Sequence, residues 1–233
     1  MIVTARNAWE ASPFPPEASV FIDVFRASTT LVYLLNAEVA EVLAVRDIEL
    51  VRELVPRGYR LISEIMRDDL DNSPSQVLGQ DLKGSRVILR TGNLTEAIFS
   101  NLDSFRHAYV ACFANARETV STVSRRGFGS VEMIACSHFS ERREAVEDLS
   151  CAEMLRSSFL GKELWVPPFL DQIMRKVEQR KTRKEVFPEH YWRDIELALT
   201  CNSICLVPEI SIESRDVISF QRAGRTQGIS SAS

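Results

Sequence analysis

Residues 20–36, V-F-I-D-V-F-R-A-S-T-T-L-V-Y-L-L-N, predict a buried strand that leads directly into a helix. The first part, residues 20–25, is apolar and rich in β-branched side chains apart from Asp23, and residues 28–36 are helix-like. A strand followed closely by a helix is typical of a βαβ unit, in which ligands bind beyond the carboxyl end of the strand. This stretch therefore indicates both the fold class and the place of a functional site.

The rest of the chain alternates in the same way between strand-like and helix-like segments. Residues 47–55 place their apolar side chains on one face of a helix. Further strands are predicted at 41–45, 60–65, 86–90, 108–112, 131–136 and 204–207, and further helices at 94–102, 115–125, 145–159 and 190–199. The alternation predicts an α/β fold with a mostly parallel sheet covered by helices on both faces. We expect one domain over residues 1–220, or two subdomains divided near 160–168, and a flexible tail over 221–233.

The composition is that of a folded protein without a polyanionic partner. With 45% hydrophobic and 26% charged residues, the 233-residue chain falls outside the disordered, collagen-like and coiled-coil classes. The net charge of -4 gives no general field that would attract nucleic acid or an anionic membrane. A basic run at 171–184 could suggest an RNA contact. Glu178 interrupts this run and no aromatic residues alternate with it, which favours a solvated helix face.

The cysteines and apolar runs indicate a cytoplasmic protein. The first nine residues lack the apolar core of a secretory signal, and the longest apolar runs have only the length of a strand. The five cysteines show no C-x-x-C spacing, so we expect reduced thiols. Three histidines without paired spacing exclude a typical zinc site, and neither a dinucleotide nor a P-loop motif occurs. A homodimer is the default expectation for a soluble enzyme of this class.

The turn after the first predicted strand carries the clearest candidate site. Asp23 offers a carboxylate of the kind that binds Mg²⁺, and Arg26 has a guanidinium suited to a phosphate or sulfonate. Ser28, Thr29 and Thr30 add hydroxyl groups at the start of a helix. These residues predict a metal–phosphate site or, equally, a buried Asp–Arg pair with Ser/Thr helix capping.

Other polar turns are weaker candidates by themselves. T-G-N-L-T at 91–95 follows a strand, but an ordinary turn capped by Thr or Asn explains it, and D-N-S-P at 71–74 is first a turn signal. Glu147 and Asp148 suit the first turn of a helix because they complement its dipole. His138 could act as a general acid or base, although a solvated loop residue is the simpler interpretation.

Taken in order, these segments resemble the 2-phosphosulfolactate phosphatase family. The matching segments are F-I-D-V-F-R-A-S-T-T at 21–30, Glu64, D-N-S-P at 71–74, T-G-N-L-T at 91–95, F-A-N-A at 113–116, V-E-D-L-S-C-A at 146–152, D-I-E-L-A-L at 194–199 and V-P-E-I at 207–210. The similarity is collinear over most of the chain, and the ordered set is more specific than any single motif. The resemblance implies a three-layer α/β/α fold and a Mg²⁺-dependent phosphoric monoester hydrolase. Such an enzyme converts 2-phospho-3-sulfolactate, or a related small acidic phosphoester, to the alcohol and phosphate, a step in coenzyme M biosynthesis.

The resemblance also implies roles by position. It makes Asp23, Glu64 and Asp148 candidate metal ligands, and Asp23, Asp148 and Glu147 candidate catalytic residues. A further set would contact the anionic oxygens of a small substrate. These residues are Arg26, Ser28, Asn72, Asn93, Thr95 and Asn115.

The chain departs from the family pattern mainly on the substrate side. The glycine-rich segment expected around Glu64 reads S-E-I-M at 63–66, and Leu94 stands where the family has a small residue facing the ligand. P-E-H-Y-W at 188–192 replaces a segment of the S-H-G-R type. Bulky residues in place of glycines change backbone conformation and pocket volume. The alternative function is a repurposed or non-catalytic member that binds a small anion or a protein partner, or that catalyses a different reaction in a specialised biosynthetic pathway.

Overall fold

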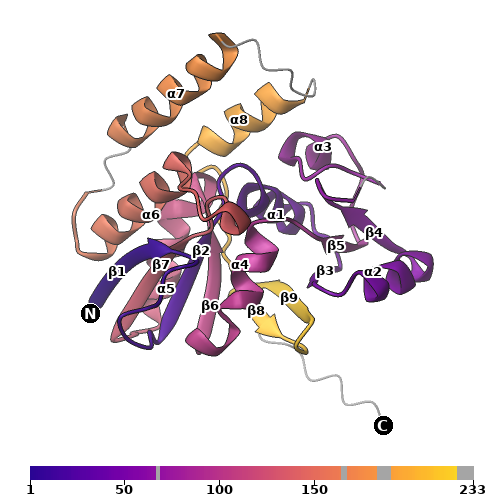
Figure 1. Ribbon diagram of the computed structural model, residues 1–233, viewed down its shortest axis with the longest axis horizontal. Coiled ribbons are helices and arrows are strands. Elements are labelled where there is room, and N and C mark those ends of the chain that lie inside the picture. The colour runs from indigo at the N-terminus through magenta and orange to yellow at the C-terminus, as the bar shows by residue number, and fades with distance from the viewer. Residues whose placement is uncertain (67–68, 164–166, 183–189, 225–233) are drawn as a thin grey trace.

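The computed structural model describes residues 1–66, 69–163, 167–182 and 190–224 (Figure 1). Its strands are β1 (Ile2–Asn7), β2 (Ala18–Ile22), β3 (Glu41–Val45), β4 (Tyr59–Ile62), β5 (Arg86–Leu89), β6 (His107–Ala111), β7 (Ser130–Ala135), β8 (Pro208–Ile212) and β9 (Val217–Arg222). Its α-helices are α1 (Ala27–Asn36), α2 (Ile48–Leu54), α3 (Pro74–Leu78), α4 (Leu94–Ser100), α5 (Ala116–Arg125), α6 (Val146–Phe159), α7 (Pro167–Thr182) and α8 (Tyr191–Leu199). Short 3₁₀ turns lie at Val55–Arg57, Leu102–Ser104, Phe113–Asn115 and Phe139–Glu141.

All these strands belong to one sheet, in the order β1-β7-β2-β6-β8-β9-β3-β5-β4. Parallel pairing joins β1, β7, β2 and β6 into one group and β3, β5 and β4 into another. The β8–β9 hairpin lies between the two groups and pairs antiparallel with both. Figure 1 shows the two groups on either side of α1 and α4. The mostly parallel sheet predicted from the sequence is therefore confirmed.

Helices cover both faces of the sheet, which gives three layers. Phe21 of β2 packs with α1 and α4 on one face, whereas Val20 and Ile22 pack with α5 and α6 on the other. This division follows from the alternation of side chains along a strand. On the β3-β5-β4 group, α2 packs through Val51. At one end of the molecule, α7 packs on α6 and α8 lies against α3 (Figure 1).

The strand β1 is absent from the sequence prediction because its residues do not look buried. Arg6 lies inside the protein, and its Nε donates to Oε2 of Glu132 in β7 at 2.9 Å. The Nη groups of Arg6 donate to Oδ1 of Asn101 and to backbone carbonyls of the β1 end. A buried ion pair is tolerated when such bonds satisfy its other donors. This pair fixes β1 beside β7.

The end of the chain also differs from the prediction. Residues 204–207 are irregular rather than a strand, because pairing begins only at Pro208 in β8. Gln221 and Arg222, predicted to begin a flexible tail, are the last residues of β9, and residues 225–233 lie outside the described part of the chain. None of the described helices is long and apolar enough to cross a membrane.

Candidate active site

Asp23 follows β2 directly and is buried, with 4% of its surface exposed. Its Oδ1 accepts a hydrogen bond of 3.3 Å from the Ala27 amide. Among the described residues, no cation forms an ion pair with Asp23, because the neighbouring Arg26 pairs with Asp71 and Asp194. The predicted alternative of a buried Asp23–Arg26 pair is therefore wrong. Asp23 is a buried carboxylate without a counter-ion.

Asp148, in the first turn of α6, is held at the same place by two backbone amides. The Val24 amide donates to Oδ1 at 2.8 Å, and the Ser137 amide donates to Oδ2 at 2.7 Å. These bonds tie α6 to the residues that follow β2 and β7. The carboxylates of Asp23 and Asp148, which are 125 positions apart in the sequence, thus belong to one site.

The site has an excess of negative charge. Burial, with the charges of Glu64 and Glu147, raises the pKa of Asp23 to about 7, although two backbone amides oppose the shift. Burial also raises the pKa of Asp148 well above its usual value, and the charges of Asp23 and Glu147 add to this effect. Such shifts arise where ionised carboxylates have no cation to neutralise them. A cation bound between Asp23 and Asp148 would relieve the repulsion.

This excess charge predicts how the stability of the metal-free protein depends on pH. The pKa of Asp23 rises from 3.8 to about 7 on folding, so the folded state holds a proton that the unfolded state releases. The stabilisation from this proton is complete below pH 3.8 and is lost as the pH rises through about 7. In EDTA, the melting temperature of Asp23→Asn relative to the wild type should therefore increase between about pH 5.5 and pH 8.5. A difference that stays constant or shrinks with pH would contradict this prediction.

Glu64 reaches the same cluster from the loop after β4. Its Oε1 accepts a hydrogen bond of 2.7 Å from the Gly92 amide, and the Asn72 side chain also bonds to it. Although the residue as a whole is exposed, protein atoms around the carboxylate raise its pKa, while the Gly92 amide, the charge of Arg26 and the Asn72 bond oppose the shift. Five strands lie between β2 and β4 in the sheet, yet the charge of Glu64 acts on Asp23. The loops after β4 and β5 therefore complete the site from the second strand group.

Arg26 is the guanidinium of this site, and two carboxylates hold it. Its Nη1 donates to Oδ2 of Asp194 at 2.8 Å, and its Nη2 donates to Oδ2 of Asp71 at 3.0 Å. Burial alone would lower the pKa of Arg26, but the hydrogen bonds and charges of Asp194 and Asp71 outweigh it and raise the pKa. The charge of Arg26 also acts on Glu64, so the guanidinium lies beside the carboxylate cluster.

Asp194, fully buried in α8, is a partner of Arg26 that was not among the site residues predicted from the sequence. Its Oδ1 accepts hydrogen bonds from the Ser73 hydroxyl at 2.7 Å and from the Ser75 amide at 3.0 Å and hydroxyl at 2.5 Å. Asp194 lies 168 positions from Arg26, so no local pattern could reveal the pair. One feature of the sequence could have drawn attention to Asp194. It is an aspartate among the apolar residues of the predicted helix 190–199, in a segment, D-I-E-L-A-L, that resembles the family.

Three of the residues predicted to contact the substrate use their side chains in hydrogen bonds within the protein. The Ser28 hydroxyl accepts the Asp23 amide at 2.8 Å, and the Thr95 hydroxyl and Thr91 cap each other's amides. Asn115 is fully buried, and its amide nitrogen donates to the carbonyls of residues 110 and 206. The N-cap residue of α4, Asn93, makes no side-chain capping bond, but the Thr91 hydroxyl accepts the Thr95 amide in the first turn of this helix. The side chains of Ser28, Thr95 and Asn115 are buried in these local contacts.

Two other predicted contacts lie closer to the cluster. Asn93 accepts the Phe139 amide at 3.1 Å and so joins the α4 start to the turn before α6. Asn72 is 4% exposed, and its Oδ1 has no hydrogen-bond partner among the described residues. Leu94, expected to face a ligand, instead packs its side chain into the core with α4. Its backbone amide donates a hydrogen bond to Asp23. The substitution therefore does not fill the site.

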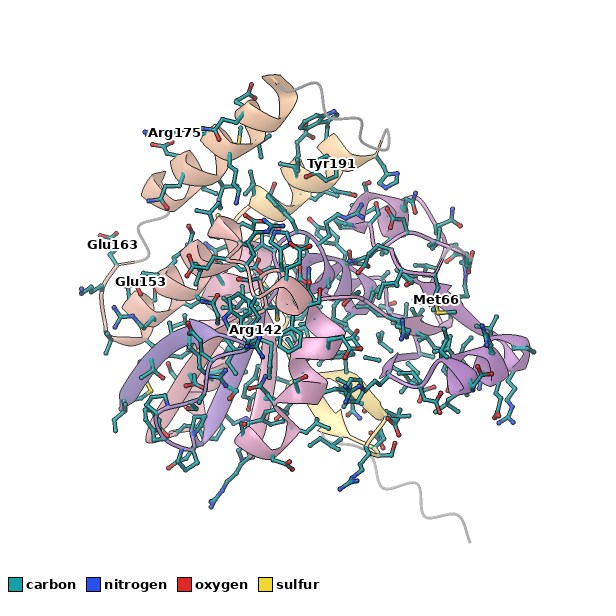
Figure 2. The ribbon with its side chains drawn as sticks, in the orientation of Figure 1. Met66, Arg142, Glu153, Glu163, Arg175 and Tyr191 are labelled. Atoms are coloured by element: carbon teal, nitrogen blue, oxygen red, sulfur yellow. The ribbon has the colours of Figure 1, made fainter. Side chains whose placement is uncertain are left out.

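The outer part of the site lies between α6 and α7. Glu147 is buried and lines a small cavity with Phe25, Ile173 and Lys176. His138 is half-buried rather than solvated, and burial followed by the charge of Arg143 lowers its pKa. Figure 2 shows the exposed Arg142, from the turn before α6, near the centre of the view.

The donor set suits a hard cation only in part. Within the described ranges, no three His, Cys, Asp or Glu side chains are grouped so that they could enclose a metal ion. Mg²⁺ commonly uses one or two carboxylates and keeps several water molecules, so a full cage of protein ligands is not needed. Asp23 and Asp148 are oxygen donors that are buried, mutually repelling and without a cation. These two residues fit such a site, and Glu64 remains a prediction as a third ligand.

Comparison with known proteins identifies the family. A family model described as 2-phosphosulpholactate phosphatase matches residues 8–212. The chain belongs to the 2-phosphosulfolactate phosphatase family. The match spans the site from Asp23 to Asp194, and it confirms the resemblance seen in the sequence.

Relatives in this family carry the name probable 2-phosphosulfolactate phosphatase. One from Deinococcus radiodurans is 40% identical over 108 residues, which cover 43% of this chain and 45% of that protein. One from Bacillus subtilis is 30% identical over 156 residues, or 63% and 66% of the two chains. One from Thermoplasma volcanium is 23% identical over 198 residues, or 82% and 88%. This chain thus spans about half of the Deinococcus protein and about two thirds of the Bacillus protein.

Proposed function

We propose that this chain is a Mg²⁺-dependent phosphatase that hydrolyses 2-phospho-3-sulfolactate or a related small acidic phosphoester. The observation that carries the proposal is the buried pair Asp23 and Asp148, which lies beside the guanidinium of Arg26 and has no counter-ion among the described residues. Membership of the family supports the reaction class. The reaction adds water across the P–O bond, so that the alcohol and inorganic phosphate are released.

Asp23 and Asp148 would hold the cation in this proposal, with Glu64 at its edge. When bound, Mg²⁺ supplies positive charge that stabilises the phosphoryl oxygens and lowers the pKa of a water molecule. Arg26 contributes the second positive charge. Its remaining N–H groups can donate to the phosphate, because Asp71 and Asp194 each take up only one of its terminal donors.

Glu147 is the carboxylate best suited to accept a proton from the attacking water. Both oxygens of Asp148 already accept backbone amides, and Asp23 would be committed to the cation. Glu147, in contrast, lines a small cavity next to Phe25, the residue before Arg26. The proton would pass from water to the Glu147 carboxylate as the oxygen attacks phosphorus.

Phosphate release tests the proposal directly. The full-length protein is assayed with 2-phospho-3-sulfolactate and a panel of small phosphoesters, with Mg²⁺ and with excess EDTA. We expect turnover that requires Mg²⁺ and prefers substrates with a second acidic group. Absence of Mg²⁺-dependent release from every phosphoester would contradict the proposal. A ligand that raises the melting temperature without turnover would instead favour a binding protein.

A further inference from the structure

A chain of hydrogen bonds runs from the start of α8 to Arg26. The Nε2 atom of His190, the residue before α8, lies 3.0 Å from Oδ2 of Asp71. The same oxygen accepts the hydrogen bond from Arg26. His190 and Arg26 therefore share one carboxylate oxygen. Figure 2 shows Tyr191, the first residue of α8, on the side of the molecule where α3 lies.

The tautomer of His190 can be assigned from its contact with Gln76, because a backbone amide fixes which way the Gln76 side chain points. The Asp71 amide can only donate, and it reaches Oε1 of Gln76 at 3.0 Å. The Gln76 side-chain nitrogen then faces Nδ1 of His190 at 3.1 Å. Because an amide nitrogen donates and does not accept, Nδ1 must be the acceptor. The imidazole proton of a neutral His190 is thereby placed on Nε2, where it is donated to Asp71.

We propose that His190 is a positioning residue for Arg26, held by Gln76 as the Nε2–H tautomer. The inference rests on the proposed function, since it assigns the purpose of Arg26 to binding the phosphate. Asp194 is fixed by the Ser73 and Ser75 donors, so one side of the guanidinium is rigid. Asp71 is partly exposed, with 24% of its side-chain surface open. His190 restricts that carboxylate and so fixes the second side of Arg26.

His190 lies between an acceptor and a donor. Its Nε2 atom faces the Asp71 carboxylate from the β4–α3 loop, and Oδ2 of Asp194, one turn along α8, is 3.9 Å from the same nitrogen. Its Nδ1 atom faces the side-chain nitrogen of Gln76. With these partners, the imidazole donates on one side and accepts on the other.

Two variants of His190 distinguish a role in positioning Arg26 from a general role in the stability of the fold. His190→Ala removes the donor to Asp71, whereas His190→Gln keeps an N–H group near the position of Nε2. His107→Ala, an exposed histidine at the start of β6, is the matched control. We expect His190→Ala to raise KM for the phosphoester and Kd for inorganic phosphate by roughly tenfold, with kcat changed much less. His190→Gln should recover most of the affinity, and His107→Ala should leave it unchanged.

Nitrogen NMR of the wild-type imidazole provides a second readout that does not depend on turnover. We expect the Nε2–H tautomer, because the Gln76 side-chain nitrogen donates to Nδ1. An Nδ1–H tautomer, or equal loss of phosphate affinity in His190→Ala and His190→Gln, would overturn the proposal. Wild-type phosphate affinity in His190→Ala would also overturn it. If phosphate affinity follows this pattern but no phosphoester is hydrolysed, the positioning role stands and the proposed function fails.

Discussion

Replacing Asp23 by asparagine is expected to reduce Mg²⁺-dependent phosphate release by roughly a thousandfold, which corresponds to a loss of several kcal/mol of transition-state stabilisation. The volume of the side chain is kept, but the negative charge that would bind the cation is removed. Because Asp23 is buried and has no counter-ion in the part of the chain that the structure describes, the same change removes a repulsion with Asp148 and Glu64. The variant should therefore be inactive and yet at least as stable as the wild type at pH 8 without metal.

Calorimetry with Mg²⁺ and a phosphate-release assay test both parts of this prediction. Asp81→Asn, which changes an exposed aspartate before β5, is the control and should bind Mg²⁺ and turn over normally. An Asp23→Asn protein that retains wild-type turnover would remove Asp23 from the metal site. An inactive variant that is also unfolded would contradict the expectation that the buried charge costs stability.

Replacing Asp194 by asparagine should have the largest effect on stability, roughly 3–5 kcal/mol of unfolding free energy. The residue is fully buried and accepts hydrogen bonds from Arg26 and from Ser73 and Ser75. Asparagine has one acceptor oxygen instead of two, so either Arg26 or the serine donors would lose their partner. The buried guanidinium would also keep only Asp71, which is partly exposed.

Chemical denaturation measures this loss as a lower midpoint at an unchanged slope. Glu196→Gln provides a matched control on the same helix, because Glu196 is exposed and its ion pair is with the exposed Arg193. The control should change the unfolding free energy by less than about 1 kcal/mol. A value for Asp194→Asn as small as that of the control would show that the network around Arg26 does not stabilise the fold.

The sequence was sufficient to predict the strand–turn–helix that carries Asp23 because burial, turn and helix start are local properties. Asp148 was reached through the resemblance of its segment to the family, and the structure brings the two carboxylates together through backbone amides that no sequence pattern encodes. The same limit explains β1, whose Arg6 is acceptable only because Glu132 lies on the neighbouring strand. Whether a charged residue such as Arg6 can be buried depends on partners that are distant in the sequence.

The two carboxylates that bind Arg26 are the clearest example of partners that a sequence pattern does not reveal. Its partners Asp71 and Asp194 come from a turn and from a helix near the end of the chain. D-N-S-P at 71–74 was predicted as a turn, but in the structure it leads into α3, with Ser73 as the N-cap and Pro74 as the first helical residue. This helix start presents Asp71. Leu94 in place of a small family residue suggested a changed pocket volume, but its side chain packs into the core instead. Sequence comparison indicates which positions changed, whereas side-chain direction depends on the fold.

The place of the β8–β9 hairpin has a consequence for how the protein is made. The strand β9 pairs with β3 through Phe220 and Val42, so the middle of the sheet is formed by a hairpin that is synthesised after all the parallel strands. During synthesis the two parallel strand groups emerge well before the element that joins them. Nascent chains that stop before β8 should therefore expose two unsatisfied sheet edges to chaperones.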